Sequence, residues 1–201
     1  MLKLKPKLRM IIVKSLSSEK LVEVIKKGGV GVIPTDTIYG LVGKALSRKT
    51  IKRVYKLKQR NPKKPSIILI GKIDDLKLFR IKLNENTKKF LQKYWPGKVS
   101  VILPCPYKKF SCLHRGTKTL AFRLPNYSEL VDLLKKTGPL IAPSANPESE
   151  EPAKTIKEAK RYFGEKVDFY ADVGQLESLP STLISIKDEK VGVLRQGEIK
   201  I

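Results

Sequence analysis

The sequence predicts an α/β protein that folds as a single domain over residues 1–201, with one mixed β-sheet and helices packed on it. Its 201 residues are ample for one such core and too few for two ordinary domains. Apolar residues at helical spacing alternate along the chain with short apolar runs that are typical of strands. Because helices and strands interleave without internal repeats, one mixed sheet is favoured.

Local signals place the elements of the N-terminal half. A helix with one apolar face is expected after Ser17 and ends at Gly28-Gly29, a glycine pair suited to a C-cap. A short strand follows over residues 30–33. Ser47 can cap the next helix, whose inner face is apolar and whose outer face is basic. The fully apolar run over residues 66–70 is typical of a buried strand.

Capping signals also place two helices of the C-terminal half. Asn126 and Glu129 are spaced like a capping box for a helix through Lys135, and Thr155 with Glu158 repeats that arrangement. The other helices are expected over residues 74–79 and 85–94. The remaining strands are expected over residues 99–103, 119–124, 168–171, 182–186 and 191–194.

The chain is strongly basic. Its 42 Lys and Arg residues against 19 Asp and Glu residues give a net charge of +23. Such a surface attracts anions such as nucleotides, RNA, acidic lipids or acidic proteins. A hydrophobic content of 41% lets the chain fold by itself, which excludes disorder of the whole chain.

Several function classes lack their signatures. Two cysteines and a single histidine give no CxxC or HExxH motif, so we expect no protein-bound metal. The apolar runs are far shorter than the ~20 residues that cross a bilayer, and the basic N-terminus has no signal-peptide core. We therefore expect a reduced, cytoplasmic location without membrane contact. P-loop and Rossmann motifs are also missing.

A basic segment ends at a candidate anion site. Residues 37–73 contain no acid, and the helical face with Lys49 is typical of a solvated surface. Lys58 and Arg60 lie where the apolar period fails. If the chain is extended from Lys58 onward, these two side chains project to the same side and face one anion together.

The motif Pro143-Ser144-Ala145-Asn146-Pro147 is a second candidate. Prolines follow both Ala142 and Asn146, so this stretch resists helix, and an extended path sends Ser144 and Asn146 to one side. Two short hydrogen-bonding groups on a stiff backbone suit the placement of a substrate. An ordinary surface turn explains the same composition, and composition alone favours the turn.

Hydroxyl groups also follow the expected strand over residues 30–33. Ligands of open α/β sheets gather at the carboxyl ends of strands, so Thr35 and Thr37 could reach one there. Threonines at strand ends are equally common as mere structure.

The expected strand over residues 119–124 carries a third set of polar groups. Thr119, Ala121 and Arg123 share one of its faces. On the inner face, Arg123 would need an anionic partner, because a buried and unpaired guanidinium is very costly.

Together and in this order, these pieces resemble the YrdC/TsaC family of threonylcarbamoyl-AMP synthases. The resemblance runs from about Ser17 to Glu198, and seven motifs in register carry it. They are Pro34-Thr35-Asp36-Thr37-Ile38-Tyr39-Gly40-Leu41, Lys58-Gln59-Arg60, Tyr94-Trp95-Pro96-Gly97, Phe122-Arg123-Leu124-Pro125, Ser144-Ala145-Asn146, Pro180-Ser181-Thr182 and Leu194-Arg195-Gln196-Gly197.

The resemblance implies a fold and a reaction. It implies the single-domain form of the family, in which a twisted α/β sheet has a basic concave face. In that hollow, ATP, L-threonine and bicarbonate react to L-threonylcarbamoyl-AMP and pyrophosphate, with Mg2+ on the phosphates of ATP. A tRNA threonylcarbamoyl transferase complex then moves the threonylcarbamoyl group to adenosine in tRNA.

The resemblance also implies roles for individual residues. Threonine would contact Thr35, Arg123 and either Ser181 or Thr182, with Arg123 forked onto its carboxylate. Asn146 would help to place the reacting groups. The phosphates of ATP would be held by five residues: Lys58, Arg60, Thr119, Ser144 and Arg195.

The chain departs from the family pattern at two places. A glutamate stands where the family has glycine after Asn146, within residues 147–152, so this loop is expected to close differently over ATP. Lys98-Val99-Ser100 replaces the usual Pro-Leu-Thr, and we expect that change to affect a supporting turn more than the site.

The alternative function is an RNA-binding module, in which the basic surface, with a net charge of +23, binds phosphates of RNA or tRNA and catalyses no reaction. It explains the charge. It does not explain why hydroxyl groups recur beside isolated arginines, and no aromatic pair for base stacking is obvious.

Overall fold

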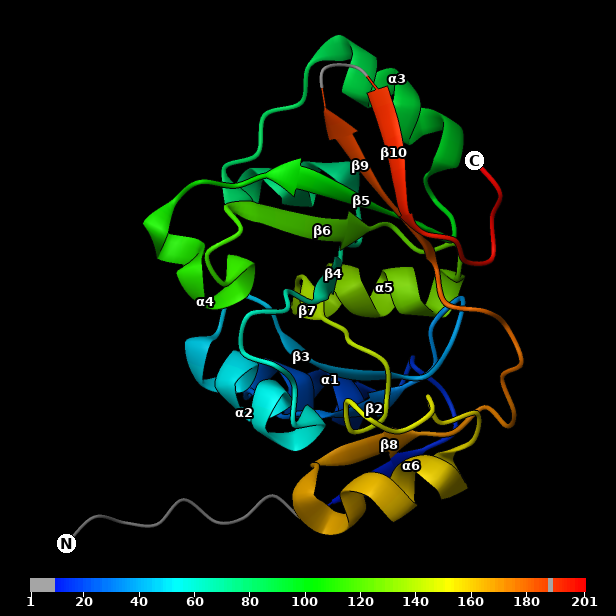
Figure 1. The fold of residues 1–201 in the computed structure, drawn as a ribbon. Helices are drawn as coiled ribbons and strands as arrows, with labels where there is room; N and C mark the ends of the chain where they lie inside the picture. Colours follow the sequence, from blue (N-terminus) through cyan, green and yellow to red (C-terminus); the bar gives the residue numbers. More distant parts are fainter. Residues whose placement is uncertain (1–9, 188–189) are drawn as a thin grey trace, which may run out of the picture.

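A computed structural model describes residues 10–187 and 190–201. Within this part of the chain, the strands form one ten-stranded sheet that twists from one end of the molecule to the other (Figure 1). The strands in sheet order are β1 (Ile11–Val13), β8 (Phe169–Ala171), β2 (Gly31–Ile33), β3 (Gly40–Lys44), β7 (Leu140–Ile141), β4 (Ile67–Leu69), β6 (Thr119–Arg123), β5 (Val99–Pro104), β9 (Thr182–Lys187) and β10 (Lys190–Arg195).

The sheet is mixed, as the sequence predicts. Parallel pairs join β8 to both β1 and β2, β4 to β6, and β5 to β9. The other neighbours are antiparallel, including the hairpin of β9 and β10 at one edge. The helices are α1 (Glu19–Lys26), α2 (Arg48–Lys58), η1 (Ile73–Phe79), α3 (Glu85–Tyr94), η2 (Lys108–Phe110), α4 (Ser111–His114), α5 (Ser128–Thr137), α6 (Ile156–Phe163) and η3 (Gly164–Lys166).

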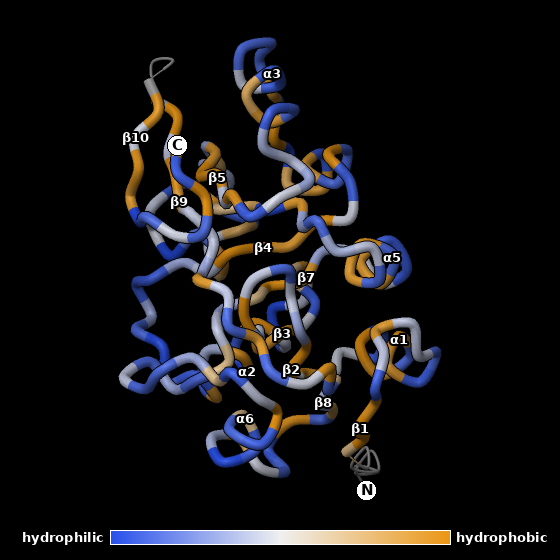
Figure 2. The backbone as a smooth tube through the Cα atoms, turned by 90° about the vertical axis from the view of Figure 1, so that its right-hand side faces the viewer, coloured by the Kyte–Doolittle hydropathy of each residue, from blue (hydrophilic) through white to orange (hydrophobic). Residues whose placement is uncertain are grey.

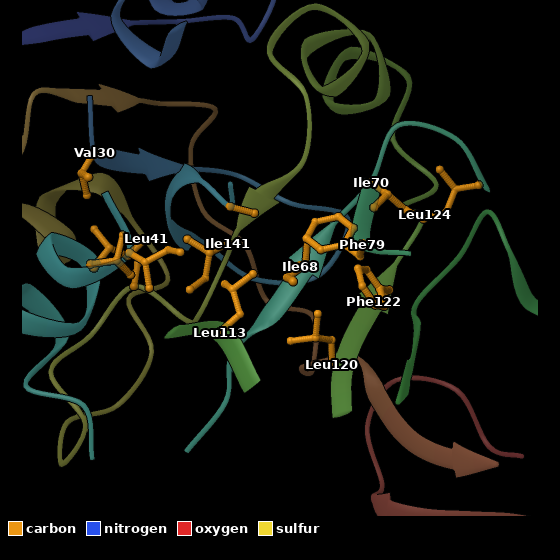
Figure 3. Close-up of a cluster of buried hydrophobic side chains, with 14 of the residues drawn as sticks. Val30, Leu41, Ile68, Ile70, Phe79, Leu113, Leu120, Phe122, Leu124 and Ile141 are labelled. Carbon is orange, nitrogen blue, oxygen red and sulfur yellow. The ribbon is translucent and has the colours of Figure 1, made fainter. Parts of the chain in front are cut away.

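Two apolar clusters cover the two faces of the sheet. Adjacent residues of one strand belong to different clusters, as Ile68 and Leu69 do on β4, because successive side chains point to opposite faces. One cluster packs against α1 and α5, whose apolar residues turn toward the sheet (Figure 2). The larger cluster includes Phe79 and Phe122, whose ring centroids lie 5.0 Å apart (Figure 3).

The helix caps explain several predicted boundaries. The Ser47 side chain accepts a hydrogen bond from the Thr50 amide at the start of α2, and Thr155 accepts one from the Glu158 amide at the start of α6. The predicted capping box at Asn126 and Glu129 is wrong. Tyr127 is the N-cap of α5, and the Glu129 carboxylate instead accepts hydrogen bonds from Ser15 and from the Leu16 amide.

Three short strands that the sequence reading did not anticipate complete the sheet. They are β1, β3 and β7, and β7 has only two residues. β1 and β7 pair only with strands distant in sequence, whereas β3 pairs with the preceding strand β2 and with the distant β7. No helix among residues 10–187 and 190–201 is long and apolar enough to cross a membrane.

Candidate active site

A cavity of about 400 Å³ lies on the face of β6, β5 and β9 opposite the Phe122 cluster. Thr119, Ala121 and Arg123 of β6 all line it, as their shared face on the strand predicts. Ile102 of β5 pairs with Ala121 and also lines the cavity. The remaining wall comes from the segments after β2, α2 and β7 and from the ends of the β9–β10 hairpin.

Three arginines line this cavity: Arg60, Arg123 and Arg195. No aspartate or glutamate is among the residues that line it in the described part of the chain. Burial lowers the pKa values of Arg123 and Arg195 from their ordinary value, and a neighbouring arginine lowers each further, while Asp36 opposes the shift of Arg123. A cavity with this charge favours a ligand that carries more than one anionic group.

Arg123 is buried, and Asp36 is the anionic partner that a buried guanidinium needs. Its Nη2 atom lies 3.1 Å from a carboxylate oxygen of Asp36, and the two side chains are 5% and 1% exposed. The same nitrogen lies 3.3 Å from the Thr35 hydroxyl oxygen. The Arg123 Nε atom is buried and has no hydrogen-bond partner in the described structure, so the guanidinium retains donor capacity.

A tight turn after β2 presents the threonines. The Thr35 hydroxyl donates to the Ile38 carbonyl at 2.7 Å and accepts a hydrogen bond from the Thr37 amide at 3.2 Å. Both threonines line the cavity, as their place at the end of a strand predicts. Asp36 accepts a hydrogen bond from the Asn126 amide, which ties this turn to the end of β6.

Lys58 lies at the carboxyl end of α2, and the predicted extended path from Lys58 to Arg60 is wrong. Gln59 adopts a left-handed conformation with φ of 50° and caps the helix. This turn separates the two side chains. Arg60 lines the cavity and donates to the carbonyls of Lys64 and Pro65, whereas Lys58 is 2% exposed and points into the adjacent loop.

The Lys58 ammonium holds the motif around Ser144 in place. Its Nζ atom donates to the carbonyl and hydroxyl oxygens of Ser144, each at 3.1 Å, and to the carbonyl and side-chain oxygens of Asn146, each at 2.9 Å. Ser144 and Asn146 therefore reach the same group, but the predicted extended path is wrong, because the backbone bends between them and the Asn146 backbone amide donates to the Ser144 carbonyl at 3.0 Å. Burial, with Arg60 nearby, lowers the pKa of Lys58 to about 8, and Glu148 opposes this shift.

Only one of these two side chains reaches the cavity. Ser144 lines it and forms a single antiparallel bridge with Gly40. Asn146 is buried away from it, and its amide donates to the carbonyls of Pro147 and Glu150. Asn146 therefore supports the loop over residues 147–152.

Glu148, in the loop that departs from the family pattern, binds this loop to the segment after α2. Its carboxylate pairs with Lys64 at 2.8 Å and accepts from the Asn61 amide. The Lys64 carbonyl in turn accepts a hydrogen bond from Arg60. Glu148 and Lys64 therefore connect the loop to the cavity arginine.

Ser181 and Thr182 are adjacent but occupy different environments. Ser181 lines the cavity, and its carbonyl accepts a hydrogen bond from Arg195 Nη2 at 2.8 Å. Thr182 does not line it. Its hydroxyl donates to the Ile199 carbonyl and accepts from the amides of Gly197 and Ile199, so it fastens the C-terminal turn.

Several polar residues at or near the cavity were given no role from the sequence. Asp36 belongs to the motif over residues 34–41, and its place between two threonines could have indicated a partner for Arg123. Thr117 lines the cavity two residues before Thr119, and its hydroxyl accepts a hydrogen bond from the Thr119 hydroxyl at 3.2 Å. Ser100 lies beneath the wall and contacts Ser181, with 2.8 Å between their hydroxyl oxygens.

The motifs in this cavity match a known family. The Sua5/YciO/YrdC family model, described as "Telomere recombination", matches residues 23–197. The chain belongs to this family. A curated Sua5/YciO/YrdC relative from Hahella chejuensis, named threonylcarbamoyl-AMP synthase, is 32% identical over 180 residues, which cover 89% of this chain and 97% of the relative.

Solved Sua5/YciO/YrdC structures agree with the fold. The crystal structure of Pyrococcus abyssi Sua5 in complex with L-threonine superposes with a TM-score of 0.84 and 25% identity, covering 94% of this chain and 57% of that one. Escherichia coli YciO superposes with a TM-score of 0.79 and 24% identity, covering 94% of each chain. The mixed α/β fold predicted from the sequence is therefore confirmed.

Proposed function

We propose that the cavity lined by Arg60, Arg123 and Arg195 is the active site for threonylcarbamoyl-AMP synthesis. The chain is a threonylcarbamoyl-AMP synthase of the Sua5/YciO/YrdC family. The observation that supports this site best is the convergence of three arginines on one cavity whose described lining contains no carboxylate. The reaction brings together a carboxylate, a carbamate and a triphosphate, so its site must be cationic.

The reaction that we propose has two steps. The amine of L-threonine adds to carbon dioxide, which derives from bicarbonate, and loses a proton, which gives a carbamate. A carbamate oxygen then attacks the α-phosphorus of ATP, and the bond to the bridging oxygen breaks, so pyrophosphate leaves with the electron pair. The protein contributes positioning and charge stabilisation, which need no histidine base.

The contacts suggest how the substrates divide the cavity. Arg123 has free donor capacity next to Thr35, which suits the carboxylate of L-threonine, and Ser181 lines the same cavity. We assign the phosphates of ATP to the side of the cavity near Arg60 and Ser144. The other residues proposed for the phosphates are Thr119, Lys58 and Arg195, and Arg195 also contacts Ser181.

Lys58 needs a rearrangement to take part. Its ammonium has three protons and already faces four oxygen atoms within 3.1 Å. A phosphate oxygen next to Ser144 would replace one of these acceptors. Asn146 and Thr182 then act by holding the loop and the C-terminal turn, since neither lines the cavity.

We propose that magnesium enters as part of the MgATP substrate. Among the described residues, no group of three or more His, Cys, Asp or Glu side chains could hold a metal ion. The oxygen donors for the ion would be phosphate groups and water, a coordination that magnesium commonly adopts with nucleotides. Bound there, it would neutralise charge on the leaving pyrophosphate.

The proposal extends to the fate of the product. Bicarbonate is the third substrate of this reaction. We further propose that a separate transferase complex transfers the product to tRNA and that the protein acts in the cytoplasm. The RNA-binding alternative is not favoured, because the named relatives are synthases and the cavity arginines are set among hydroxyl groups.

Pyrophosphate release tests the function directly. We expect release from MgATP that requires both L-threonine and bicarbonate, and loss of that release in Arg60→Ala. Lys49→Ala is the matched control, since Lys49 is an exposed cation at the other end of α2 and we expect it to leave turnover unchanged. Release that ignores L-threonine, or an unchanged Arg60→Ala, would contradict the proposal.

A further inference from the structure

Ser100 lies directly beneath the wall of the cavity. It is 0% exposed and sits on β5, two residues before the cavity residue Ile102, so both side chains are on the same face of the strand. On one side, Ser100 pairs with Leu183 of β9, which also lines the cavity. On the other side, one more step of the β5–β6 register places Ser100 across from Arg123.

Ser100 makes one side-chain contact with the site. Its hydroxyl oxygen lies 2.8 Å from that of Ser181, and no other hydrogen-bond partner of the Ser100 side chain is present in the described residues. Ser181 receives a second contact, because Arg195 Nη2 donates to its hydroxyl oxygen at 3.3 Å. The three residues form a chain that ends at the cavity wall.

The direction of the hydrogen bond between the two serines follows from burial. If Ser181 donated to Ser100, the Ser100 proton would be left without an acceptor in a fully buried place, which is unfavourable. If Ser100 donates, its proton is satisfied, and Ser181 accepts from both Ser100 and Arg195. Both lone pairs of Ser181 are then occupied, so its own proton is free to point into the cavity.

We infer that Ser100 is a positioning residue that directs the hydroxyl proton of Ser181 toward an anionic oxygen of the substrate. Ser181 contacts Ser100, which the β5–β6 register places across from Arg123, the residue proposed to bind the L-threonine carboxylate, so we assign that oxygen to this carboxylate. This inference rests on the proposed function. It also revises the sequence-based expectation that Lys98-Val99-Ser100 matters mainly for a supporting turn.

A double-mutant cycle with direct binding tests this coupling. The affinity of L-threonine is measured by calorimetry for the wild-type chain, Ser100→Ala, Ser181→Ala and the double variant, with KM values for L-threonine and MgATP alongside. We expect Ser181→Ala to lose about tenfold in affinity for L-threonine and Ser100→Ala about fivefold. In the Ser181→Ala background, Ser100→Ala should have no further effect, and the KM for MgATP should stay unchanged.

Variants of equal shape separate the hydroxyl from packing. Ser100→Thr and Ser100→Val introduce side chains of the same size, but only the Thr side chain keeps a hydroxyl donor. We therefore expect the Ser100→Thr variant to bind L-threonine more tightly than the Ser100→Val variant. Ser185→Ala, on β9 outside the cavity lining, is the control for loss of a strand serine.

The outcomes are distinguishable. Additive losses in the double variant, or equal affinities of the Thr and Val variants, would overturn the role of Ser100 while the proposed function stands. A change in the KM for MgATP alone would overturn the assignment to L-threonine. Wild-type protein that binds no L-threonine would overturn the proposed function and this inference with it.

Discussion

Replacing Asp36 by asparagine should destabilise the protein more than a single substitution usually does. Asp36 is the acid that accompanies the buried guanidinium of Arg123, and their side chains are 1% and 5% exposed. Asp36→Asn keeps the size of the side chain and an oxygen that can still accept from the Asn126 amide. The variant therefore removes the negative charge while it changes little else.

The distance between the two groups sets the magnitude. At 3.1 Å, two unit charges attract by about 5 kcal/mol with an effective dielectric constant of about 20. Removal of one partner from a buried pair costs about 3–5 kcal/mol, because the other charge stays buried without compensation. Since domains are stable by roughly 5–15 kcal/mol, we expect the variant to fold in buffer with a much lower free energy of unfolding.

Urea denaturation followed by circular dichroism measures this loss. With a slope of about 2 kcal/mol/M, the midpoint should fall by about 2 M. Asp74→Asn is the matched control, since it makes the same chemical change in the exposed Asp74–Lys77 pair and should leave the midpoint unchanged. Equal midpoints for Asp36→Asn and the wild-type chain would refute the argument that Arg123 depends on this partner.

Three further predictions test other parts of the structure. In a 13Cε NMR titration, Lys58 should titrate near pH 8, well below the ordinary 10.5, because burial disfavours its charged form. The unfolded chain then binds the extra proton between these values, so the free energy of unfolding should rise from about pH 8 to 10.5, and a midpoint near 10.5 would contradict the burial. Ser47→Ala should lower the free energy of unfolding by about 1 kcal/mol, whereas Ser18→Ala should not, because Ser18 makes no side-chain cap bond; equal effects in thermal melts would contradict this. Gly31→Ala should cost about 2 kcal/mol or more, because its Cβ would lie 2.2 Å from the Phe169 carbonyl oxygen, and Gly192→Ala should cost less, since its nearest contact is 3.3 Å; the reverse order of denaturation midpoints would exclude this clash as the cause.

Local sequence signals predicted the longer helices well, but they missed the short helical segments η2, α4 and η3 and three strands. The helix over 85–94 has the predicted bounds, and Asn84 caps it through the Thr87 amide, a contact three residues away in the chain. The strands β1 and β7 were missed because few residues define them and their partners are distant. The capping box at Asn126 failed because Glu129 instead satisfies the Leu16 amide, more than one hundred residues away.

In the candidate site, too, local features could be predicted from the sequence and long-range contacts could not. The motifs around Thr35, Lys58 and Ser144 are local, so the sequence by itself was enough to single them out. Their arrangement is not local. The left-handed Gln59 turns Arg60 away from Lys58, and the oxygens that hold the Lys58 ammonium come from the loop 86 and 88 residues further on.

The sequence by itself determined the order of the elements, the charge of the chain and which residues are chemically competent, because these depend on residue type and on near neighbours. Only the tertiary structure decided which of those residues meet. It gave Arg123 the buried Asp36, placed Ser181 rather than Thr182 at the cavity, and set Ser100 beneath it. Each of these contacts joins segments that only strand pairing and packing bring together. A local sequence pattern carries no information on the distance between side chains that are far apart in the chain.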